Sequence, residues 1–247
     1  MIKLTRYPKP NFLTDEKVAE LTKKFKKNKI NVWNNDKIKE PLLNSSNKKC
    51  AYCECSLDKE AQYMEVEHFE DKDNNSDKVV EWENLLPSCK RCNGSKSTHD
   101  VIIKPIVNPY VDEPKEHFKL KNYRLKRKTD KGKESIDVCD LNNSQRVVKV
   151  RFEIGNKLED TIENAKDKYD LYLRDKTTRR KNRFINIIKD LLRECQTNSM
   201  YSATTSTILH SNETFIDLVQ KLKDKLLWDE EHEDLYNKSL ELVLEYN

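Results

Sequence analysis

Four of the seven cysteines form two identical pairs, Cys50 with Cys53 and Cys89 with Cys92. A C-x2-C pair turns the chain so that two thiolates reach one tetrahedral Zn2+ at distances of about 2.3 Å, and two such pairs make a closed structural site. Residues 54–88 separate the pairs, a longer insert than the roughly 15–20 residues of a simple zinc ribbon. We therefore expect a structural zinc ion that closes a loop with a folded element inside it.

The expected cellular compartment favours metal binding over disulfides for these cysteines. Residues 1–13 contain no apolar core of the length that a secretory signal needs, and no stretch approaches the roughly 20 apolar residues of a membrane span. We expect a soluble, cytoplasmic protein without a membrane partner, in which thiols stay reduced. The other cysteines are expected to be buried small apolar side chains, although Cys55 lies two residues from the first pair; they are Cys55, Cys139 and Cys195.

The insert and the residues just after it carry groups that can bind a cation or move a proton. An acid–His pair, Glu67 and His68, ends a short stretch over residues 63–69 in which apolar and polar residues alternate, and Asn84 follows. Asn93 and Lys96 come directly after the second cysteine pair. The alternation predicts a strand, and the order of the whole window predicts strand, loop, strand and short helix.

This window resembles the HNH endonuclease family, in which an acid–His pair ends a strand, an Asn follows, and a final His or Asn lies on a helix just past a C-x2-C. The resemblance implies a ββα-metal core that hydrolyses phosphodiester bonds with a divalent cation. His68, with an ordinary pKa near 6.5, would be the general base. Glu67 and Asn93 would bind the catalytic metal. Asn84 would fix the loop beside His68, and Lys96 would contact phosphate.

The final position of the motif differs from the commonest HNH pattern, because it is Asn93 rather than a histidine. An amide oxygen makes the donor set all-oxygen, so we expect Mg2+ or Mn2+ as the catalytic ion. Glu65 lies on the same strand face as Glu67 by alternation and is a candidate second acid near the metal. The remaining histidines are expected at surface or structural positions, with His99 the nearest to the motif; they are His99, His117, His210 and His232.

A narrower resemblance covers about residues 45–155. It is to the PtuB family of HNH proteins, found in Septu anti-phage systems and in some retron-linked defence loci. The resemblance implies a regulating partner, the ABC/SMC-like ATPase PtuA, and a nucleic-acid substrate: DNA by default, with structured RNA such as tRNA left open. It rests on the segments 50–53, 67–69, 84–85, 92–93, 108–114, 117–118, 141–142 and Arg146.

Charge is distributed unevenly along the chain. Residues 1–49 carry 13 basic against 5 acidic side chains, residues 50–105 carry 7 against 12, and residues 106–155 carry 12 against 8. Basic flanks around an acidic centre suit a nuclease, because the flanks attract phosphate while the carboxylates bind a cation. The alternative is that the lysines of residues 23–29 only form the solvent-exposed face of a helix.

We expect an α+β protein: a ββα-metal core with a four-cysteine zinc knot, an N-terminal helical arm and a largely α-helical C-terminal region. The expected segments are a basic arm and helix at 1–44, the nuclease core at 45–105, an associated extension at 106–155 and helices at 156–247. A helix should begin near Thr14 and Asp15, residues 40–49 should be rich in turns, and residues 196–212 should be a loop.

Two alternatives remain open from the residues. The C-terminal helices either dock a partner or pack on one another or on the HNH module. The zinc knot either supports a nuclease or belongs to a zinc ribbon that binds nucleic acid without cutting it. The presence of the full set Glu67, His68, Asn84 and Asn93 favours the nuclease, because a binding ribbon has no use for it.

Overall fold

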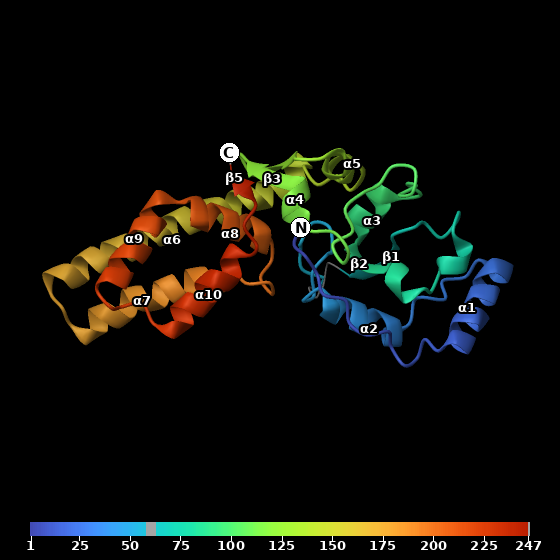
Figure 1. Cartoon of the computed structure of the whole chain (residues 1–247), viewed down its shortest axis with the longest axis horizontal. Helices are drawn as coiled ribbons and strands as arrows, with labels where there is room; N and C mark the ends of the chain where they lie inside the picture. Colours follow the sequence, from blue (N-terminus) through green and yellow to red (C-terminus); the bar gives the residue numbers. More distant parts are fainter. Residues whose placement is uncertain (58–62, 247) are drawn as a thin grey trace. The chain divides into compact units, whose positions relative to one another are not determined.

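The computed structural model of the chain describes residues 1–57 and 63–246. The chain folds into two compact units, which are described separately here. Unit 1 comprises Met1–Phe118 and Lys126–Asn142, and unit 2 comprises Lys119–Leu125 and Asn143–Asn247. Figure 1 colours unit 1 mainly blue to green and the helices of unit 2 yellow to red.

A two-stranded sheet and a short helix form the centre of unit 1. Strand β1 (Met64–His68) pairs antiparallel with β2 (Leu85–Cys89), so that Glu67 lies opposite Leu86. The connection contains two 3-10 turns, η1 (Ser76–Lys78) and η2 (Trp82–Asn84). Helix α3 (Lys90–Lys96) follows β2 directly. The expected order of strand, loop, strand and helix is confirmed, and with it the α+β fold.

Two helices precede this sheet. Helix α1 (Asp15–Asn28) begins where the sequence predicted, with the Thr14 hydroxyl accepting a hydrogen bond from a first-turn amide, and it buries Leu21 and Phe25. Helix α2 (Asp36–Ser45) occupies half of the stretch that was expected to form turns. That expectation was wrong, because Ile38 and Leu42 at i and i+4 are completely buried and hold the segment helical.

Short elements follow, some in unit 1 and some in unit 2. Helix α4 (Pro114–His117) leads into β3 (Phe118–Lys121), and β4 (Arg124–Arg127) leads into α5 (Asp130–Val138). The chain therefore passes from unit 1 to unit 2 and back within β3 and β4. Strand β3 pairs parallel with β5 (Glu245–Tyr246), so this small sheet has the order β4-β3-β5.

Unit 2 is a set of helices around its own apolar core. After the π-helical turn η3 (Ser144–Val148), the helices are α6 (Lys149–Arg174), α7 (Thr178–Arg193), α8 (Ser202–Ser211), α9 (Glu213–Asp224) and α10 (Glu230–Leu240). Helix α6 packs on α7, α8 and α9, and α10 packs on α7 and α8 (Figure 1). Ile162, Phe184, Ile188 and Phe215 are among the buried side chains of the core, in the region where the sequence predicted helices.

Helix α8 lies in the stretch that was expected to be a loop. Its sequence is rich in Ser and Thr, which usually favour turns, yet most of its side chains are buried. The hydroxyls have hydrogen-bond partners: Thr205 and Thr207 each donate to the carbonyl four residues earlier, and Ser206 donates to the carbonyl of Cys195, which precedes the helix. Because the polar atoms have partners, burial overrides the turn preference of these residues.

Within the described ranges, no helix combines the length and the apolar character that a bilayer span requires.

We predict that Gly132→Ala destabilises unit 1 by about 1–3 kcal/mol. A Cβ at position 132 of α5 would lie 2.2 Å from the backbone oxygen of His117, which cannot move aside as a side chain could. Gly94→Ala on α3 is the matched control, since a Cβ there meets nothing within 4 Å and alanine favours a helix over glycine by about 1 kcal/mol. Urea unfolding of the three proteins measures both effects; equal stability of Gly132→Ala and the parent would contradict the close approach.

Candidate active site

The two cysteine pairs meet at one point in unit 1. The sulfurs of Cys50, Cys53, Cys89 and Cys92 all lie within 4.8 Å of one another, and all four residues are buried. A tetrahedron with Zn–S bonds of about 2.3 Å has edges of about 3.8 Å, and the Cys53 and Cys89 sulfurs are 3.8 Å apart. The arrangement therefore fits a closed zinc site, and its four thiol ligands leave no coordination position for a substrate.

The general-base candidate, His68, ends β1 with its ring in a defined orientation. Its Nε2 lies 2.9 Å from the backbone oxygen of Val79. Because a carbonyl can only accept, Nε2 carries the proton, and in the neutral ring Nδ1 is left as the acceptor. Burial lowers the pKa of His68 to about 4, with Lys72 and Lys96 adding to the effect. The imidazole is therefore neutral near pH 7 and able to take a proton.

Glu67 and Lys96 form a buried ion pair between β1 and α3. The Lys96 ammonium lies 2.7 Å from Glu67 Oε1 and donates to the His68 backbone oxygen at 2.8 Å. Both residues are 2 % exposed. The Tyr52 hydroxyl also donates to Glu67, at 3.4 Å. Burial raises the pKa of Glu67 to about 7, and Lys96 opposes that rise. The pair ties β1 to α3.

Glu65 and Asn93 form a second, less buried contact between β1 and α3. The Asn93 side-chain amide donates to Glu65 Oε2 at 2.7 Å, and both residues are half-buried. With His68 they line a pocket of ≈ 370 Å³. Two oxygen-bearing side chains in hydrogen-bond contact beside a neutral imidazole are the combination that a metal-assisted hydrolysis requires. Glu67 and Lys96 do not line this pocket.

Asn84 is buried and bonds to the connection that follows β1. Its Oδ1 accepts from the Glu70 amide at 2.7 Å, and its Nδ2 donates to the carbonyls of Glu70 and Lys78. The Asn84 carbonyl accepts from the Phe69 amide at 2.9 Å. These bonds hold both ends of the segment that presents the Val79 carbonyl to His68, and through them Asn84 would exert its predicted effect on the loop.

The N-terminal arm anchors β2 from outside the motif. The Arg6 guanidinium lies 3.9 Å from the centre of the Tyr110 ring and donates to the carbonyls of Trp82 and Leu85. The Trp82 indole donates in turn to the Tyr7 carbonyl at 2.8 Å. Arg6 is a positioning residue that the sequence did not reveal, since a single arginine in an extended arm has no spacing to distinguish it.

The other four histidines have structural partners. His99 Nε2 lies 2.7 Å from the Lys104 carbonyl, and His117 Nδ1 lies 2.7 Å from the Thr129 hydroxyl. In unit 2, His210 contacts Ser239, and His232 contacts Asp229 at the start of α10.

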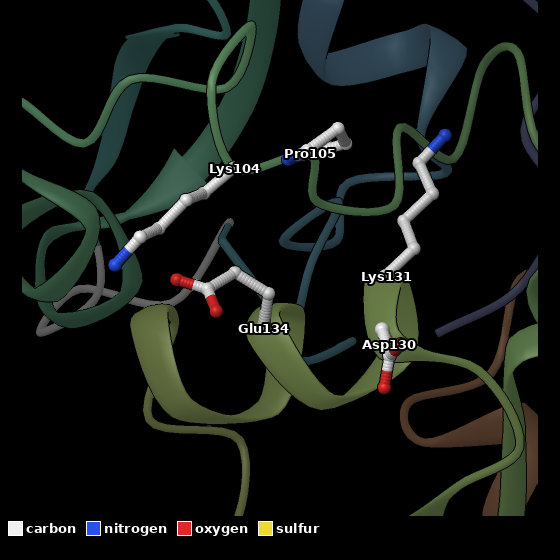
Figure 2. A pocket seen from close by; sticks show the side chains of 5 residues that line it. All are labelled: Lys104, Pro105, Asp130, Lys131 and Glu134. Atoms are coloured by element: carbon white, nitrogen blue, oxygen red, sulfur yellow. The ribbon is translucent and has the colours of Figure 1, made fainter.

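The polar side chains that line a second pocket in unit 1 do not all point toward one another. It is lined by Lys104, Pro105, Asp130, Lys131 and Glu134 (Figure 2). The Lys131 side chain extends away from Glu134 in Figure 2, and its ammonium pairs with Asp112 at 2.7 Å. The pocket of His68 is therefore the better candidate for chemistry in this unit.

The aromatic and basic rim of that pocket was not anticipated from the sequence. Trp33 packs edge to face with His68, with ring centroids 4.5 Å apart, and Lys39 and Lys72 also line the pocket. Trp33 stands among asparagines between two helices, where no periodicity marks it. Its only signal in the sequence is a large aromatic residue in an otherwise polar connection.

Comparison with known proteins identifies the family of the chain. Residues 50–99 match the HNH endonuclease family. The chain is 44 % identical to the Septu protein PtuB of Bacillus thuringiensis over 99 % of this chain and 95 % of that protein. It is 28 % identical to a Septu protein PtuB of Bacillus mycoides (strain KBAB4), over 51 % of this chain and 54 % of the relative.

We predict that the purified chain holds one zinc ion and that Cys92→Ser removes it together with much of the stability of unit 1. Loss of a structural zinc site removes folding free energy directly. Cys55→Ser is the matched control, a conservative change at a cysteine outside the tetrad that should keep the zinc. Elemental analysis and thermal unfolding measure both effects. Loss of zinc from Cys55→Ser would instead make the fifth sulfur a ligand.

Proposed function

Since the chain belongs to the PtuB family and carries an HNH endonuclease domain, we propose that it is the metal-dependent nuclease of an anti-phage defence system. An HNH endonuclease domain implies a hydrolase of phosphodiester bonds. The observation that carries the proposal is the convergence of Glu65, His68 and Asn93 on one open pocket, next to a cysteine cluster that fits zinc.

His68 is proposed to activate the attacking water. Its Nδ1 accepts the proton, while the Nε2–H bond to Val79 holds the ring and stabilises the imidazolium that forms. Burial disfavours that charged form, and the hydrogen bond to Val79 offsets part of this cost. Asn84 keeps the Val79 segment in place through its bonds to Glu70 and Lys78.

Glu65 and Asn93 have the chemistry of a site for a hard divalent cation. Carboxylate and amide oxygens are the donors that Mg2+ and Mn2+ prefer. The Asn93 amide now directs Nδ2 at Glu65, and rotation about its terminal bond would bring Oδ1 to the same place. A cation held there would stabilise the charge on the phosphate and on the leaving oxygen.

This assignment differs from the sequence-based expectation that Glu67 binds the metal. Glu67 is enclosed by Lys96 and Tyr52 and contributes nothing to the lining of the pocket. Removing it from Lys96 would leave a buried unpaired ammonium, which costs about 3–5 kcal/mol. We propose that Glu67 and Lys96 are a structural pair and that Glu65 is the acidic metal ligand.

DNA is the proposed substrate, with a structured RNA of the tRNA type as the second candidate. The alternative function is a zinc module that binds nucleic acid without cutting it. By family resemblance, an ABC/SMC-like ATPase (PtuA) would hold and regulate the nuclease. The helices of unit 2 pack on one another around a common core, so a partner would bind their outer faces; co-purification of the full chain with a co-expressed ATPase tests this.

We predict that the purified protein nicks plasmid DNA or cuts RNA in Mg2+ or Mn2+, that EDTA stops the reaction, and that His68→Ala lowers the rate by about 10²–10⁴-fold. Thermal unfolding should confirm that the variant is folded. Metal-dependent cleavage that survives in His68→Ala would exclude this residue as the base. Salt-sensitive binding without cleavage, alone or with the ATPase, would support the binding module.

A pair of isosteric variants separates the two glutamates. Glu65→Gln should weaken the apparent affinity for Mg2+ by roughly 100-fold with little change in stability. Glu67→Gln should lower the stability by about 3–5 kcal/mol, and adding Lys96→Met should recover much of it. Cleavage over a Mg2+ titration and urea unfolding provide the two readouts. A stable Glu67→Gln with weakened metal dependence, beside an unaffected Glu65→Gln, would restore Glu67 as the ligand.

A further inference from the structure

One wall of the active-site pocket comes from a part of the chain that the HNH match does not include. The match begins at residue 50, whereas Asn31, Trp33, Asn34 and Lys39 line the pocket opposite β1 and α3. The connection from α1 to α2 and the first turns of α2 supply these residues. The pocket is therefore incomplete without the N-terminal helices.

Trp33 contacts the general-base candidate directly. Its ring meets the His68 ring at an interplanar angle of 80°, and Phe25 of α1 packs against Trp33 at 5.6 Å between centroids. This row of three rings runs from the buried face of α1 to the imidazole. With Nε2 bonded to Val79, the contact with Trp33 provides the imidazole with a second restraint.

Two lysines line the same pocket from different elements. Lys39 projects from α2, and its ammonium has only a long contact of 3.4 Å with the Asn34 side chain. Among residues 1–57 and 63–246, no carboxylate forms an ion pair with Lys39. Lys72 lies 3.7 Å from Asp73 in a solvent-exposed pair, of a kind that contributes little. Both ammonium groups can therefore exchange solvent for an anion at low cost.

We propose that residues 31–39, together with Lys72, form the backbone-binding wall of the nuclease. Lys39 and Lys72 bind phosphates next to the scissile one, and Trp33 is a positioning residue for His68. The inference rests on the proposed nuclease function and adds to it the residues that bind the nucleic-acid strand. Such contacts are to the sugar-phosphate backbone, so they carry affinity without sequence preference.

The lysines are tested by binding, without cleavage, in full-length His68→Ala protein. A fluorescein-labelled DNA duplex and a labelled single-stranded RNA are titrated in Mg2+ over a series of salt concentrations. Lys39→Ala and Lys72→Ala should each weaken binding and reduce the slope of log K against log salt by roughly 0.7–0.9, the loss of one phosphate contact. Lys37→Ala is the matched control, an exposed lysine of the same helix that does not line the pocket.

The slopes of the variants distinguish phosphate binding by the pocket lysines from general attraction to a basic surface. Unchanged slopes in both pocket variants, with a parent that binds, would overturn the lysine wall and leave the nuclease proposal intact. Slopes reduced equally by Lys37→Ala would show general attraction to a basic face and would also overturn the wall. A parent that binds neither probe would overturn the wall and the nucleic-acid substrate together.

Trp33 is tested by kinetics with His68 restored. Trp33→Ala should lower kcat by about 10-fold or more with little change in KM, because a displaced base acts on the chemical step, and Trp33→Phe should recover most of the rate. Equal melting temperatures of the two variants separate this effect from loss of folding. An unchanged kcat, a loss confined to KM, or a loss that phenylalanine does not rescue would overturn the positioning role.

Discussion

The closure of residues 50–92 by four cysteines is the constraint on which the active site depends. The sheet of β1 and β2 has only two strands of five residues each, and an isolated two-stranded ribbon is marginally stable in water. A metal bound by Cys50, Cys53, Cys89 and Cys92 would act as a cross-link and would stabilise the fold by about 4 kcal/mol for a loop of this length, because it lowers the entropy of the unfolded chain. It would also fix the start of α3, because Cys89 is the cap of that helix.

With α3 fixed, the alternating glutamates of β1 acquire different environments. Glu67 is buried between β1 and α3. A buried carboxylate needs a partner to remain charged, and Lys96 supplies one from the last turn of α3. Glu65 lies at the rim, where solvent and Asn93 satisfy it. Two glutamates two residues apart on one strand thus lie in different environments, one buried in an ion pair and one at the pocket. The same Lys96 ammonium bonds the His68 carbonyl, so the ion pair also restrains the position of His68.

Residues outside the HNH region complete the site. Arg6 holds the turn before β2 by bonding three carbonyls, and Phe25 and Trp33 pack in sequence toward His68. The 50-residue motif is too small to bury its own elements on all sides, so the N-terminal helices act as part of the core of unit 1. Unit 2 needs no such support, because its helices share a continuous apolar core.

The sequence by itself determined the cysteine cluster, the order of the elements and the helical character of unit 2. The cysteine spacing predicted the cluster and the alternation before His68 predicted β1, because each of these signals depends on neighbours within a few residues. Helix α8 was missed because the satisfaction of its hydroxyls depends on burial, which local composition does not encode. The tertiary structure alone decided which glutamate is buried and which ring faces His68. Strand alternation places Glu65 and Glu67 on the same face, and only the packing of α3 and of the connection at Trp33 against β1 distinguishes them.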